Sequence, residues 1–265
     1  MTATPPGPVI RARDLLASEW TKLSATRSNA WTLAAAALAT LAVTAIAAHA
    51  IGAARVPPPA TGPVNSLTAS FLGYAEYAVL PVSILGALAF TSEYSTGLIR
   101  TTFTCVPHRR AVLAAKAAVT GAAALAAGEA LAFVTFLLTQ ALMAGGHRGV
   151  SLADPGALRG VLAAGLLLAV VALTGLGLGA IIRHTAGAIA ATVGVIYLIT
   201  ALCLVLPGPW NTRIGRFTLP FAAFQIVTGH PQASLLPPGE SLLVVLAWPA
   251  VILLIAAVFI TRRDP

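Results

Sequence analysis

Six stretches of this sequence are apolar over about 20 residues each, the length that an α-helix needs to cross the hydrocarbon core of a bilayer. Charged residues make up only 9% of the chain, against about 25% in a typical soluble domain. So few charges could not cover a soluble surface, and the mean hydropathy of +0.88 excludes a disordered chain. We therefore expect an all-α integral membrane protein with six transmembrane helices, at about 31–51, 71–91, 117–143, 160–182, 186–206 and 241–260.

Basic residues are distributed unevenly over the loops between these spans. Eleven of the 16 Lys and Arg residues fall on the N-terminal side and five on the opposite side. Because cytoplasmic loops carry the excess of Lys and Arg, we expect a multi-pass protein of the cell inner or plasma membrane with both termini in the cytoplasm. The net charge of +8 is accounted for by these loops and by contact with anionic headgroups. The lipid bilayer is thus an expected partner, and nucleic acid is not.

The polar N-terminal region, residues 1–29, precedes a six-span domain at 30–265. Within it, Leu16, Trp20 and Leu23 share one face of a helix, with polar residues around the rest. This pattern is typical of an amphipathic helix lying on the cytoplasmic membrane surface. The alternative is an ordinary positively charged anchor before the first span.

The cytoplasmic loop between spans two and three has the pattern of a short helix. Leu98, Ile99, Thr102 and Phe103 form one face, and Gly97 allows a sharp change of direction before it. A short helix held at the membrane surface, with a small apolar face, can dock into a groove on a soluble partner. The alternative is an interfacial loop with snorkelling cations.

Two further features lie away from this loop. Between spans five and six, at 207–240, Phe217, Phe221 and Phe224 recur at helical spacing, which predicts a re-entrant or interfacial outer helix. Glu129 lies midway along the third span, where a charge costs about 2.5–3.5 kcal/mol on insertion scales. It is interpreted either as a route-lining or proton-sensitive carboxyl, or as a structural residue that is protonated or hydrogen-bonded to Gln140 or to a threonine of a neighbouring helix.

Two blocks of sequence resemble the bacterial ABC-2-type permeases, especially the actinobacterial ones. These blocks are Ser18-Glu19-Trp20-Thr21-Lys22-Leu23 with Arg27, and Ser92-Glu93-Tyr94-Ser95-Thr96-Gly97-Leu98-Ile99-Arg100-Thr101-Thr102 followed by Pro107, Arg109, Arg110 and Lys116. The resemblance implies that the surface helix and the loop after the second span contact an ATP-binding subunit. The residues it assigns to that contact are Glu19, Lys22, Arg27, Glu93, Gly97, Leu98, Arg100, Thr102 and Phe103. Within this set, Glu93 and Arg100 are the best candidates for polar coupling contacts.

The same resemblance implies a permease subunit of an ATP-driven exporter, working as two permeases, identical or paired, with two ATPase subunits. ATP and Mg would then bind the partner, and this chain would bind no cofactor or metal. The sequence contains no GxxxxGK[ST], no HExxH and no pair of carboxylates, so an enzyme is not expected. The apolar spans suit an apolar or amphipathic substrate, such as a lipid, a drug-like natural product or a peptide. Two alternatives remain, namely a secondary transporter that uses Glu129 and a non-transporting membrane sensor or scaffold.

Overall fold

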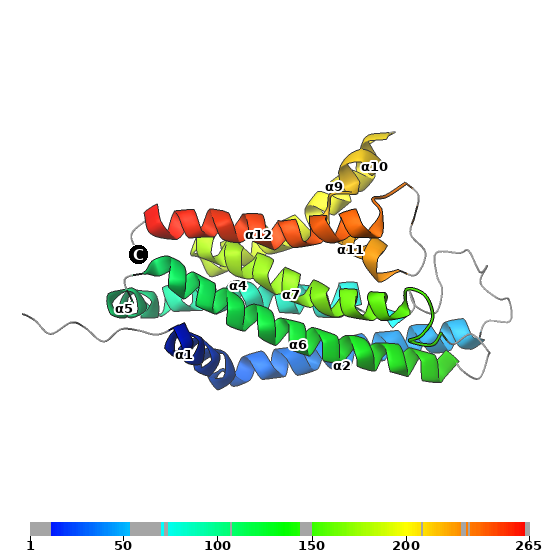
Figure 1. The fold of residues 1–265 in the computed structure, drawn as a ribbon, viewed down its shortest axis with the longest axis horizontal. Helices are drawn as coiled ribbons and strands as arrows, with labels where there is room; N and C mark the ends of the chain where they lie inside the picture. Colours follow the sequence, from blue (N-terminus) through cyan, green and yellow to red (C-terminus); the bar gives the residue numbers. More distant parts are fainter. Residues whose placement is uncertain are drawn as a thin grey trace, which may run out of the picture.

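The computed structural model describes residues 12–53, 70–71, 74–106, 108–143, 150–207, 209–228, 232 and 234–262. Within these ranges the chain forms helices and no strands, which confirms the all-α prediction. The long helices run side by side along the longest axis of the molecule (Figure 1). Pro107, several residues of the outer segment 207–240 and the first 11 residues lie outside the described ranges.

Five helical segments are long and apolar enough to cross a membrane. They are α2 (Arg27–Ala53), α6 (Arg109–Met143), α7 (Ala157–Ile182), α12 (Pro238–Arg262) and the segment Thr185–Val205. The last comprises α8 (Thr185–Val193), the π-helical turn η3 (Gly194–Leu198) and α9 (Ile199–Val205). Five of the six predicted spans thus correspond to such segments.

The second predicted span is less regular than the others. A π-helical turn, η1 (Tyr74–Ala78), leads into α4 (Val79–Ser95), which has 17 residues and contains Pro81. Proline cannot donate the backbone hydrogen bond to the preceding turn, which accounts for the change of helix type just before it. A sixth apolar segment of spanning length arises only when α4 is joined to α5 (Leu98–Cys105), although the two are bent by 85°.

Helix α7 forms the centre of the bundle and packs against α4, α6 and α12. Glycines bring the backbones together: Gly86 faces the carbonyl oxygen of Ala172, and Gly175 faces that of Ser83. At both places a Cβ atom would overlap the opposing backbone oxygen. The contact between α4 and α7 therefore depends on the missing side chains, as is typical of close helix pairs in membranes.

The N-terminal helix α1 (Ala12–Ala25) is confirmed as a helix, and a break at Thr26 separates it from α2. On the predicted apolar face of this helix, Leu16 and Trp20 are exposed and Leu23 is half-buried. Helix α1 packs mainly against α6. It lies at the same end of the bundle as α5 and the C-terminal end of α12 (Figure 1).

The outer segment forms two short helices in its described part, α10 (Pro209–Gly215) and α11 (Leu219–Val227). The sequence pattern placed Phe217 on the same helix as Phe221 and Phe224, and this is wrong. Phe217 lies in the turn before α11, because Pro220 fits only in the first turn of a helix and Thr218 is extended.

Candidate functional site

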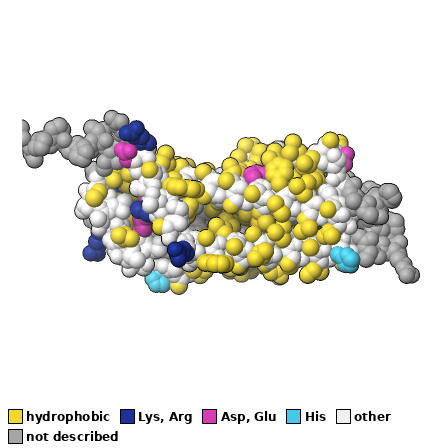
Figure 2. All heavy atoms as spheres, turned by 90° about the horizontal axis from the view of Figure 1, so that it is seen from below, with side chains coloured by type: hydrophobic (Ala, Val, Ile, Leu, Met, Phe, Trp, Pro, Cys, Tyr) yellow, Lys and Arg dark blue, Asp and Glu magenta, His cyan; other side chains and the backbone are white. Residues whose placement is uncertain are grey.

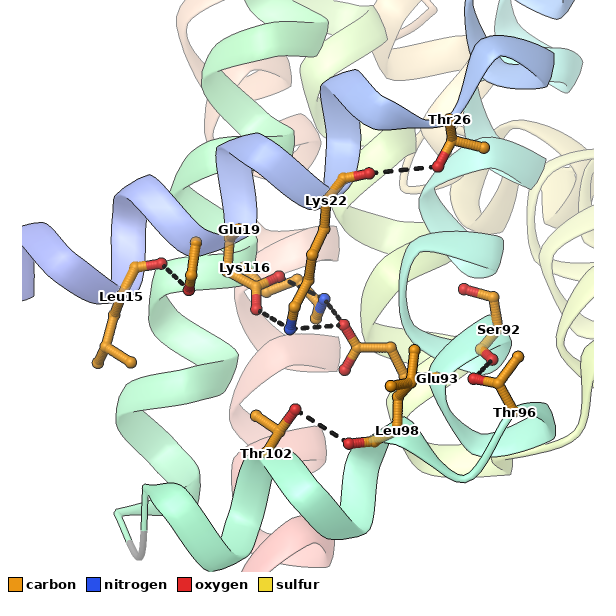
Figure 3. Close-up of polar contacts among 11 residues, drawn as sticks. Leu15, Glu19, Lys22, Thr26, Ser92, Glu93, Thr96, Leu98, Thr102 and Lys116 are labelled. Atoms are coloured by element: carbon orange, nitrogen blue, oxygen red, sulfur yellow. Dashed lines mark hydrogen bonds and ion pairs between the residues drawn. The ribbon is translucent and has the colours of Figure 1, made fainter.

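Four charged side chains from three helices form a closed ring at the end of the bundle that carries α1 and α5 (Figure 3). Lys22 Nζ lies 2.7 Å from Glu19 Oε1 and 3.0 Å from Glu93 Oε1. Lys116 Nζ lies 2.5 Å from Glu19 Oε2 and 2.8 Å from Glu93 Oε1. We call these residues the charge ring. It joins three helices, because Glu19 and Lys22 belong to α1, Glu93 belongs to α4 and Lys116 belongs to α6.

Three members of the charge ring are almost fully buried. Glu19 and Glu93 are each 5% exposed and Lys116 is 4% exposed, whereas the side chain of Lys22 is 39% exposed. Moving such charges out of water costs several kcal/mol per ion, and only close pairing offsets that cost. The packing of α1 against the bundle therefore depends on the ion pairs that Glu19 and Lys22 form with Lys116 and Glu93.

The pKa of Lys22 reflects its two partners. Burial alone lowers the pKa of this ammonium group, but hydrogen bonds and charge attraction from Glu19 and Glu93 outweigh burial and raise it. Since the pKa is higher in the folded than in the unfolded chain, the contribution of Lys22 to stability is present at neutral pH and is lost only at strongly alkaline pH.

Lys22 and Lys116 are the two lysines of the sequence, and the other 14 basic residues are arginines. A lysine ammonium is a compact point charge with three donors, which suits a position between two carboxylates better than the planar guanidinium does. Sequence reasoning placed Lys116 among the loop cations and missed its role. Because the sequence has only two lysines, the choice of lysine over arginine at position 116 was the signal that could have identified Lys116 as a special position.

Helix α5 leaves α4 through Gly97, which adopts a left-handed conformation with φ of 74°. Ile99 and Phe103 are buried, whereas Leu98 is 55% exposed and Arg100 is exposed. The predicted apolar face is thus divided, because Ile99 and Phe103 pack against the bundle while Leu98 points away from it. The sharp bend also ends the continuous helix that would have placed Glu93 and Arg100 on one face.

At this end of the bundle, two arginines donate hydrogen bonds to the C-terminal end of α12. The Arg109 guanidinium lies 5.3 Å from the ring centre of Phe103 and donates to the carbonyl oxygen of Ile260 at 3.3 Å. Arg183, in the tight α7–α8 connection, donates to the carbonyl oxygen of Phe259. Both contacts satisfy carbonyls at the C-terminal end of α12, where no intrahelical donor remains. Through Phe103 and Arg109, the inner face of α5 is therefore connected to the C-terminal end of α12.

The residues predicted to contact an ATPase are divided by the structure into buried and exposed sets. Glu19, Glu93 and Phe103 are buried within the chain, and Thr102 is half-buried. The exposed residues of the set are Lys22, Arg27, Gly97, Leu98 and Arg100. The exposed residues of the set therefore come from α5 with the glycine before it, from the end of α1 and from the first residue of α2, and Lys22 among them also belongs to the charge ring.

Glu129 is half-buried in the middle of α6, and its carboxyl group packs against Gly165 of α7. The buried Oε2 atom accepts no hydrogen bond from the described part of the chain. The Gln140 side chain contacts Ser70 and the backbone of Val150 instead. A hydrogen bond from Gln140 to Glu129, one of the structural interpretations, is therefore absent from the described contacts.

No protein-family model matches this chain, and no curated protein matches its sequence.

Proposed function

We propose that this chain is the membrane-spanning permease subunit of an ATP-driven exporter, whose motor is a separate ATPase polypeptide. The observation that carries the proposal is the arrangement of α5. This helix projects at 85° from α4, is anchored by Ile99 and Phe103, and exposes Leu98 and Arg100. An exposed apolar side chain beside a cation on a short, anchored helix suits a groove on a soluble partner.

The charge ring gives such a docking surface a mechanical connection to the spans. Glu93 lies four residues before Gly97, so a displacement of α5 acts on the end of α4 that carries it. Through Lys22 and Lys116 the same carboxylate is joined to α1 and α6. A push on α5 would therefore move three helices together.

The basic residues favour the cytoplasm as the location of this surface. On the face shown in Figure 2, the visible Lys and Arg side chains gather at one end, while hydrophobic side chains cover the middle. In the proposed topology, six spans leave both termini in the cytoplasm, with α5 and α1 facing the ATPase. Two permease chains, identical or paired, and two ATPase chains would form the transporter.

An apolar cavity of about 690 Å³ lies towards the opposite end, between α4, α7, α9 and α11. Its lining includes Tyr74, Ile196, Phe221 and Phe224, with few polar groups. A cavity of this size and character suits an apolar or amphipathic molecule. We therefore propose a lipid, a drug-like natural product or a hydrophobic peptide as the substrate class, and a re-entrant position for α10 and α11 near the exit.

The proposal predicts that the double variant Leu98→Asp/Arg100→Glu loses its ATPase partner. A buried apolar anchor and a paired cation at an interface together contribute on the order of 2–4 kcal/mol, so partner retention should fall at least tenfold. The measurement is purification of the tagged chain from its own membranes, followed by identification of bound subunits and assay of their ATPase activity.

Arg262→Glu is the matched control, because Arg262 is exposed at the same end of the bundle but lies at the end of α12. It should retain the partner. Reproducible recovery of the unmodified chain without any nucleotide-binding protein would contradict the proposal.

A secondary transporter is the second candidate, because Glu129 offers a carboxyl oxygen without a hydrogen-bond donor in the middle of a span. If the exporter proposal holds, Glu129→Gln should leave the ATPase activity of the purified complex within about twofold, since glutamine has the shape of a neutral carboxyl group. Measuring the ATPase activity of the Glu129→Gln complex and its pH dependence distinguishes the exporter from the secondary transporter. Substrate flux that needs no ATP and loses its pH dependence in Glu129→Gln would favour the secondary transporter.

A further inference from the structure

A second cavity, of about 450 Å³, is lined by residues of α1 and α2 on one side and of α4, α6 and α7 on the other. Its interior is lined mostly by alanines, with Leu131 and Leu168 among the larger side chains. Along α6 the lining extends from Thr120 to Leu131, which corresponds to about 16 Å at 1.5 Å per residue. This length is close to one leaflet of a bilayer, whose full hydrocarbon core is about 30 Å thick.

The interior of this cavity does not suit water. A buried water needs two to four polar partners, and among the described lining residues away from the α1–α2 junction only Thr120 has a polar side chain. The volume equals that of about 15 liquid waters, which is far too large to remain empty beside a fluid bilayer. The surrounding medium consists of acyl chains, which have the right polarity and length to fill it.

The mouth of the cavity has the opposite character. Ser24, Thr26 and Asn29, at the junction of α1 and α2, line it together with the half-exposed indole of Trp20. Arg27 is exposed in the first turn of α2, two turns before the lining residue Ala34 and on the same helix face. A polar rim beside a cation is complementary to an anionic headgroup in contact with interfacial tryptophan.

From this distribution we infer that the cavity, referred to below as the lipid slot, binds one anionic phospholipid of the leaflet on the α1 side. One acyl chain lies between α2 and α6, and the phosphate lies at the α1–α2 junction near Arg27. The lipid fills the space between the residues of α2 and α4 that line the slot, and therefore forms part of the packing of the first span. This inference is independent of whether the chain exports a substrate.

The test is reconstitution of the full chain into nanodiscs of equal phosphatidylglycerol and phosphatidylcholine, followed by gentle release and native mass spectrometry. The unmodified chain should retain one phosphatidylglycerol. Ala34→Phe should lose it, because the ring occupies the slot, whereas Ala35→Phe should keep it, because Ala35 is exposed and does not line the slot. Arg27→Gln should lower the preference for phosphatidylglycerol by about fivefold, and Arg262→Gln should leave that preference unchanged.

Several outcomes would overturn the inference. The first is that the unmodified chain retains no lipid, and the second is that the Ala34→Phe and Ala35→Phe variants retain equal amounts of lipid. The third is that a second copy of the chain occupies the slot, which would be observed as a dimer that Ala34→Phe abolishes. Equal retention of phosphatidylglycerol and phosphatidylcholine by the unmodified chain would contradict the inference that the bound lipid is anionic. Because Arg27 is exposed at the rim, its variant keeps the test decisive even if Ala34→Phe does not fold.

Discussion

Replacing Lys116 with methionine is expected to destabilise the folded chain by about 3–5 kcal/mol, the usual cost of removing one partner from a buried ion pair. Methionine preserves much of the volume but leaves the carboxylates of Glu19 and Glu93 buried without their inner cation. Glu93 Oε2 already accepts no hydrogen bond from the described residues, so little compensation is available. Thermal unfolding of both proteins in the same detergent and lipid measures the effect.

Lys22→Met is the matched control for this variant. Its ammonium group contacts the same two carboxylates, but its side chain is 39% exposed, so water can replace it and the loss should stay below about 1 kcal/mol. Adding Glu19→Gln and Glu93→Gln to Lys116→Met should recover part of the lost stability, because no uncompensated charge remains. Equal losses for Lys116→Met and Lys22→Met would show that burial does not govern the charge ring.

Gly86→Ala and Gly175→Ala are each expected to destabilise the bundle by about 3 kcal/mol. At both glycines the added Cβ atom would overlap a backbone oxygen of the facing helix, which cannot rotate away as a side chain can. The helices α4 and α7 would have to separate, and α7 is the helix on which α4, α6 and α12 all pack. Thermal unfolding, with limited proteolysis of the α4–α5 bend, measures the loss.

Gly194→Ala provides the control, because nothing lies within 4 Å of the added atom and the backbone at Gly194 is helical, with φ of −58°. There the substitution should be neutral or stabilise by up to about 1 kcal/mol, since alanine loses less backbone entropy on folding. Similar destabilisation by all three substitutions would contradict the role given to the helix contact, because helix propensity alone favours alanine over glycine and Gly194 faces no atom within 4 Å.

The sequence predicted the class of fold because an apolar stretch of 20 residues has few alternatives to a helix. It also located α5, since Gly97 and the spacing of Ile99 and Phe103 are local signals. Local signals failed where a single proline decides a boundary. Pro220 starts α11 after Phe217, although the spacing of the phenylalanines favours one continuous helix.

The charge ring could not be predicted for a different reason. Glu19 and Lys116 are 97 residues apart in the chain, and Glu93 and Lys116 are 23 apart, so no periodic pattern connects them. Each residue, taken alone, looks like an interfacial charge at the end of a helix. That both acids face inward became evident only once α1, α4 and α6 were placed together.

The charge ring also imposes an order on biogenesis. Synthesis proceeds from the N-terminus, so Glu19 and Glu93 leave the ribosome before Lys116 does. Until α6 has been synthesised, Lys22 is the only cation of the charge ring that is available to Glu19 and Glu93. The charge ring can therefore close only after α1, α4 and α6 have all been synthesised.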